Sequence, residues 1–106
     1  MDTRSGLGAS GPVRAGQAVT VTVPNLPANA VAVVMNVTVT HATAPGYLTV
    51  YPSGQARPVA SNLNFAAGQT VANQVTVAVG AGGKVSFFVN NGTADLIADL
   101  AGTFTQ

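Results

Sequence analysis

Residues 30–51, AVAVVMNVTVTHATAPGYLTVY, are the stretch that decides the fold. In its first half, valine or methionine occupies every second position from Val31 to Val39. This period of two is the pattern of a β-strand with one buried face. After a turn at Ala42–Gly46 the apolar alternation resumes at Leu48 and Val50. The stretch therefore predicts two strands joined as a hairpin, on which the rest of the chain builds.

Five further segments show the same alternation between Gly, Pro and Asn turn signals. They are Gln17–Val23, Ala60–Phe65, Gln69–Val79, Lys84–Val89 and Thr93–Thr105. The turn Asn90-Asn91-Gly92 is the strongest short hairpin signal, because Asn and Gly both accept positive φ. No segment has a helical period. We predict an all-β, antiparallel two-sheet β-sandwich of seven or eight strands, Ig-like or jelly-roll-like, with a small barrel as the alternative.

The composition fits one domain, residues 1–106, with residues 1–16 as an N-terminal arm or loop. Hydrophobic residues make up 47% of the chain, which excludes disorder, and no apolar run is long enough for membrane insertion. Charged residues make up only 7% and the net charge is +1, so there is no basic stripe for nucleic acid. The absence of cysteine excludes disulfides and thiolate chemistry.

Several short motifs follow one another along nearly the whole chain. They are Asp2-Thr3-Arg4, Asn36-Val37-Thr38-Val39-Thr40, Gly46-Tyr47-Leu48-Thr49-Val50-Tyr51-Pro52-Ser53-Gly54, Arg57-Pro58, Ser61-Asn62-Leu63-Asn64-Phe65, Gly68-Gln69-Thr70-Val71-Ala72-Asn73 and Asp95-Leu96-Ile97-Ala98-Asp99-Leu100-Ala101-Gly102-Thr103-Phe104. In this order they resemble a module that recurs, often in tandem, in secreted and surface proteins of actinobacteria. Met1 replaces that module's usual leucine, and Thr103 its usual aromatic residue. The resemblance implies an extracytoplasmic, non-catalytic module and transfers no activity.

The surface composition also favours an extracellular or cell-surface location, because Thr, Asn, Gln, Ser and Gly stand where Lys and Glu are usual. Met1 directly before Asp2 is typical of a start codon added to an excised domain, and no signal peptide is present. We therefore expect a domain that works beside neighbouring modules or associates with itself.

The ionisable residues do not predict catalysis. Asp95 and Asp99 lie on one face of a strand, about 13 Å apart at the usual rise, which is too far for either glycosidase mechanism. His41 is a lone histidine beside a turn, and we expect it to be exposed. Asp2, Asp95 and Asp99 are too dispersed for a calcium loop. We expect no enzyme activity, no metal and no cofactor.

A structural ion pair is predicted between Arg4 and Asp99, on the assumption that the N-terminal arm lies along the last strand. Bidentate guanidinium–carboxylate bonds are directional, and the chain is otherwise poor in charge. The functional alternative for this pair is an anion or sugar site.

A glycan site is the main alternative to a purely structural module. Tyr47, Thr49 and Tyr51 share a strand face opposite to the apolar one, and exposed aromatic rings can stack on sugars. Asn62 and Asn64 could supply hydrogen bonds to such a ligand. The competing interpretation is that the tyrosines cap the edges of the core and the asparagines satisfy loop backbone.

These observations favour a structural or adhesive module, either a rigid spacer or a unit of an assembly. Strands of Thr and Val with almost no charge lack the edge lysines that normally block sheet-to-sheet pairing. The alternative is a carbohydrate-binding module.

Overall fold

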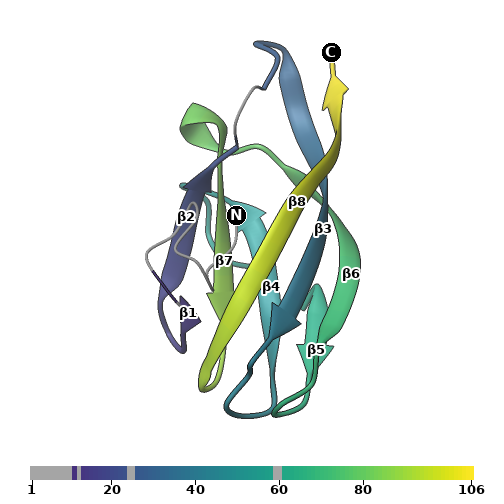
Figure 1. The fold of residues 1–106 in the computed structure, drawn as a ribbon. Coiled ribbons are helices and arrows are strands. Elements are labelled where there is room, and N and C mark those ends of the chain that lie inside the picture. The colour runs from purple at the N-terminus through teal and green to yellow at the C-terminus, as the bar shows by residue number, and fades with distance from the viewer. Residues whose placement is uncertain (1–10, 12, 24–25, 59–60) are drawn as a thin grey trace.

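A computed structural model of the chain describes residues 11, 13–23, 26–58 and 61–106 (Figure 1). These residues form eight β-strands and no α-helix. The strands are β1 (Val13–Arg14), β2 (Ala18–Thr22), β3 (Ala30–Thr40), β4 (Gly46–Pro52), β5 (Leu63–Phe65), β6 (Val71–Ala78), β7 (Lys84–Val89) and β8 (Thr93–Thr105). A short 3-10 turn, η1 (Ala81–Gly83), leads into β7.

The strands form two antiparallel sheets of four, which pack face to face as a β-sandwich (Figure 1). One sheet, with the order β1-β8-β3-β6, is called the β8 sheet below. The other, with the order β2-β7-β4-β5, is called the β7 sheet. The prediction of an all-β sandwich is confirmed. β1 falls inside the segment that was predicted to be an arm or loop, where it pairs with the start of β8 through Val13↔Ala94 and Arg14↔Thr93.

The predicted hairpins are wrong. β3 and β4 lie in different sheets, and so do β7 and β8, although a strong turn signal connects each pair. β3 pairs with β6 and β8, whereas β4 pairs with β5 and β7. Among the described strands, only the connection between β4 and β5 stays within a sheet. The turn residues reverse the chain direction, but they carry it across the core rather than to an adjacent strand.

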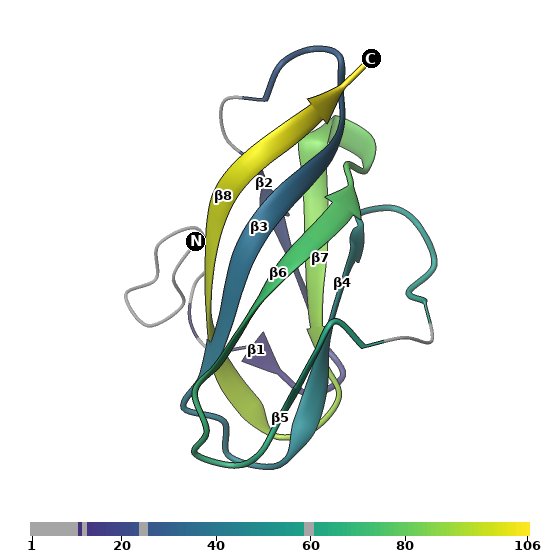
Figure 2. The ribbon, with the colours of Figure 1, turned by 90° about the vertical axis from the view of Figure 1, so that its right-hand side faces the viewer.

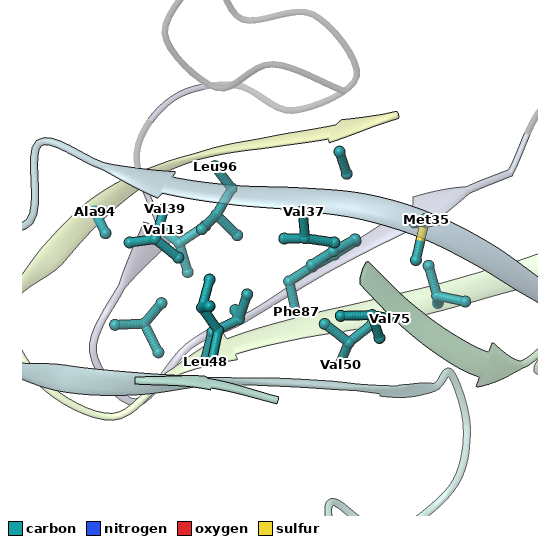
Figure 3. Close-up of a cluster of buried hydrophobic side chains, with 14 of the residues drawn as sticks. Val13, Met35, Val37, Val39, Leu48, Val50, Val75, Phe87, Ala94 and Leu96 are labelled. Atoms are coloured by element: carbon teal, nitrogen blue, oxygen red, sulfur yellow. The ribbon is translucent and has the colours of Figure 1, made fainter. Parts of the chain in front are cut away.

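The core lies between the sheets (Figure 3). Met35, Val37 and Val39 enter it from β3, and Leu48 and Val50 enter from β4 on the opposite side. The alternating apolar residues of 30–51 therefore enter the same core from both sheets. This is why the sequence pattern resembles that of a single apolar face. Phe87 is the largest fully buried side chain and lies at the centre of this cluster.

The end of β8 departs from the predicted pattern. Leu96, Ala98, Leu100 and Phe104 were expected to share the buried face, but Phe104 is 54% exposed and Leu100 is 43% exposed. The register with β3 shifts here, because Leu100 is opposite Met35 while Gly102 is opposite Val34. One extra residue reverses the side-chain alternation beyond the bulge. Phe104 therefore lies on the outer face, beside Ala32.

Candidate functional site

The tyrosines of the predicted glycan site lie on the outer face of the β7 sheet. The register places Tyr47 beside Asn64 of β5, Thr49 beside Phe88 of β7, and Tyr51 beside Ser86. Both tyrosines are half-buried and Asn64 is exposed. Directly opposite residues of an antiparallel pair point to the same face, so these side chains form one surface.

The centre of this surface is not open to a ligand. Thr49 is 1% exposed and Phe88 is 7% exposed, although both point away from the core. The Arg57 guanidinium lies 3.6 Å from the centroid of the Phe88 ring, a cation–π contact. Arg57 thus occupies the aromatic face on which a sugar ring would stack. The prediction of Thr49 as an accessible contact between two exposed tyrosines is wrong, since the second face of β4 is also partly covered.

Asn62 holds the backbone of its neighbours rather than facing outward. Its Oδ1 accepts a hydrogen bond from the Val50 N–H at 2.7 Å, and its own N–H donates to the Leu48 carbonyl at 2.8 Å. Asn73 Nδ2 donates to the Asn62 carbonyl at 3.0 Å, which links β6 to the residue before β5. These bonds match the structural interpretation of the asparagines. Of the two asparagines assigned to the glycan site, Asn64 is exposed and Asn62 is half-buried.

A second set of polar contacts joins the connections at the ends of β3 and β7. Asn90 Oδ1 accepts a hydrogen bond from the Tyr47 N–H at 2.7 Å, and Asn91 Nδ2 donates to the Pro45 carbonyl at 3.2 Å. A Cβ at Gly46 would lie 2.5 Å from Asn90 Oδ1, so a larger residue there would displace the Asn90 side chain that binds the Tyr47 N–H. The sequence marks these asparagines only as turn formers. Their bonds to the other connection depend on tertiary contacts that the turn motif does not encode.

His41 is exposed, as predicted, but it is not alone. Its Nδ1 lies 2.9 Å from Asp95 Oδ2, with the histidine side chain 66% exposed and the aspartate side chain 12% exposed. His41 also has a φ of +54°, which is uncommon for a residue other than glycine. The sequence did not indicate this contact, which forms because β8 pairs with β3 and brings Asp95 opposite Thr40.

This contact between a histidine and an aspartate resembles the His–Asp part of a Ser–His–Asp catalytic triad. Within the described residues, the His41 ring forms its hydrogen bond with Asp95, and no hydroxyl is bound to it. The described residues also contain no group of three or more His, Cys, Asp or Glu side chains that could hold a metal ion. The pair therefore joins the ends of β3 and β8.

The predicted Arg4–Asp99 pair involves a residue outside the described part of the chain, as Arg4 and Asp2 both lie in residues 1–10. Asp99 itself is exposed and lies opposite Asn36 on the outer face of the β8 sheet. It also borders a groove of about 170 Å³ between β2 and β8, lined mainly by apolar side chains. The pair remains a prediction.

No helix in the described parts of the chain is long and apolar enough to cross a membrane. Comparison with known proteins identifies no relative, since no family model, no curated protein and no solved structure matches this chain.

Proposed function

We propose that this chain is a non-catalytic structural module of a bacterial secreted or cell-surface protein, and that it works as a rigid spacer or assembly unit. One observation carries the proposal. Two of the polar side chains expected to contact a ligand are committed to the fold, since Asn62 binds backbone and Thr49 is buried, and Asn73 and Asn90 likewise bind backbone. Among the described residues, no buried side-chain nitrogen or oxygen lacks a hydrogen-bond partner.

The connectivity supports a rigid unit. Because the chain passes between the sheets at almost every described connection, β4 and β5 are the one pair of consecutive described strands that lie in the same sheet. One sheet cannot separate from the other without breaking contacts that are distant in sequence. Such a unit resists local opening, which is where proteolysis begins. Resistance of this kind suits a module that holds its neighbours apart outside the cell.

A carbohydrate-binding module is the second candidate, and one juxtaposition favours it. Tyr47 and Asn64 are register partners on an outer face, and both reach solvent. A ring edge beside an amide can bind a sugar, although Arg57 occupies the neighbouring aromatic ring. This arrangement offers a single ring rather than a groove.

A glycan array with the purified domain tests the choice between the two candidates. Tyr47→Ala and Asn64→Ala variants are run beside the unchanged chain, and a thermal melt verifies that each variant is folded. The structural proposal expects no specific binding from any of the three. Specific binding by the unchanged chain that is lost in the folded Tyr47→Ala variant would overturn it in favour of a carbohydrate-binding module.

A further inference from the structure

The outer face of the β8 sheet is made mostly of uncharged side chains. Figure 2 shows β8, β3 and β6 side by side toward the viewer, with no described element in front of them. The register arranges the outward side chains in rows across β6, β3 and β8, namely Ala72–Thr38–Ile97, Gln74–Asn36–Asp99, Thr76–Val34–Gly102 and Ala78–Ala32–Phe104. The exposed Phe104 lies at one end of this face.

Charge is divided between the two outer faces. Asp95 and Asp99 belong to the outer face of the β8 sheet, where Arg14 on the short edge strand β1 is the one Lys or Arg among the described residues. On the opposite side of the sandwich, Lys84 begins β7 and is exposed, and Arg57 lies over Phe88. Among the described residues, the middle of one face is therefore acidic and the other face is basic, in a chain that carries few charges of any kind.

Two other charged groups lie on this face toward the start of β8, and neither is close to Asp99. Arg14 is opposite Thr93, six residues along β8 from Asp99, a distance of about 20 Å at the rise of a strand. His41 is bound to Asp95. Asp99 is consequently the carboxylate that gives the middle of this face its negative charge.

We propose that copies of this chain stack front to back, with the outer face of the β8 sheet of one copy against the outer face of the β7 sheet of the next. This inference rests on the proposed structural function and names a second copy as the partner. Like charges on two acidic faces would oppose each other, whereas Asp99 of one copy and Lys84 of the next attract. Phe104 and the half-buried Tyr47 and Tyr51 supply apolar contact across such an interface.

The available area makes this contact weak. Three strands spaced about 4.8 Å apart, over the eight residues of β6, offer about 400 Å² for each copy. Both copies together then bury about 800 Å², which is below the size of stable complexes. Because the two faces differ, the contact is heterologous and does not close, so it extends into rows. This weak contact becomes important where copies are linked in one chain, since linkage raises the effective concentration of one face near the other.

Sedimentation velocity over a concentration series tests the proposal with the full chain. The unchanged chain is expected to associate as its concentration rises, and to associate less at high salt, because salt screens exposed charges. Asp99→Lys alone and Lys84→Glu alone are each expected to weaken association by at least about tenfold. Arg14→Glu is the matched control and should change it little.

A mixture of the two weakened variants gives the decisive result. Asp99→Lys keeps an intact basic face and Lys84→Glu keeps an intact acidic face, and the two substituted faces are also opposite in charge, so an equimolar mixture is expected to recover association. Recovery is peculiar to a heterologous contact between these two faces. A mixture that stays dissociated, an unchanged chain that stays monomeric, or an equal effect of Arg14→Glu would overturn the stacking proposal.

The failure of stacking is distinguishable from failure of the proposed function. A monomer that binds no glycan refutes stacking and leaves the rigid spacer. Specific glycan binding refutes the structural function whatever the sedimentation result.

Discussion

The two long edges of the sandwich are built differently. At the β5–β6 edge the sheets are joined by the Asn73–Asn62 hydrogen bond of 3.0 Å, and Phe65 is 5% exposed. At the β2–β8 edge the described strands leave a groove of about 170 Å³, and Leu100 on its wall is 43% exposed. In Figure 2 the connection between β5 and β6 turns at the lower end of the sandwich, so these two strands of different sheets are joined directly there.

This difference shows what closes a sandwich with so few charges. At the closed edge an amide side chain replaces the strand pairing that two separate sheets cannot make. At the open edge apolar side chains face each other without filling the space between them. Residues near β5 and β6 should therefore contribute more to the stability of the protein than residues at the β2–β8 edge. Substitutions at the two edges measure this difference.

The largest expected effect comes from truncating an apolar residue at each edge. Phe65→Ala should lower the free energy of unfolding by about 3–5 kcal/mol, because it removes a buried ring and leaves a cavity. Leu100→Ala should cost about 1 kcal/mol or less, since its side chain is already partly in water. Urea unfolding of both variants measures the difference. Equal losses would show that the open edge is as tightly packed as the closed one.

An intermediate effect is expected from the asparagines. Asn62→Ala leaves the Val50 N–H without its acceptor and should cost about 1–3 kcal/mol. Asn64→Ala is the matched control, two residues away and exposed, and should change stability by no more than about 0.5 kcal/mol. Thermal melts of the two variants compare them. If Asn64→Ala proved the more damaging, the bracing role assigned to Asn62 would be wrong.

The sequence predicts the strands and their buried faces well. The alternation of Val33, Met35, Val37 and Val39 identifies β3 and its core face. With the exception of β1, each remaining strand lies within a predicted segment or extends it by one residue. This succeeds because burial of one face is a local pattern with a period of two. It fails at Phe104, where a bulge that depends on pairing with β3 reverses the pattern.

Strand pairing and the site could not be predicted in the same way. Turn chemistry at Asn90-Asn91-Gly92 specifies a reversal, but not whether the next strand joins the same sheet or the opposite one. His41 and Asp95 are distant in sequence and meet only because β8 pairs with β3. Covering of Phe88 by Arg57 likewise depends on the path of the connection between β4 and β5. Each of these contacts follows from topology rather than from a local motif.

Filling the open edge should stabilise the protein. Ala98 lines the groove, and Ala98→Val adds two methyl groups where space exists, for a gain of about 1 kcal/mol. Ala94→Val is the control on the same strand and the same face, in the packed part of the core, where added volume should cost about 1–3 kcal/mol. Chemical unfolding of the two variants should give changes of opposite sign. Destabilisation by Ala98→Val would mean that the groove has no usable room.

The smallest effect is expected at the end of β3, where a hydrogen bond joins this strand to each neighbouring segment. Thr40 Oγ1 lies 2.9 Å from Thr70 Oγ1 on the side of the closed edge, and His41 binds Asp95 on the side of β8. His41→Ala loses an exposed pair worth at most about 1 kcal/mol and keeps the positive φ. His41→Gly loses the same pair but removes the backbone strain, a gain of about 1 kcal/mol. Thermal melts should therefore place His41→Gly close to the unchanged chain and His41→Ala below it. The opposite order would show that the imidazole–carboxylate bond, rather than the backbone conformation, controls stability at this position.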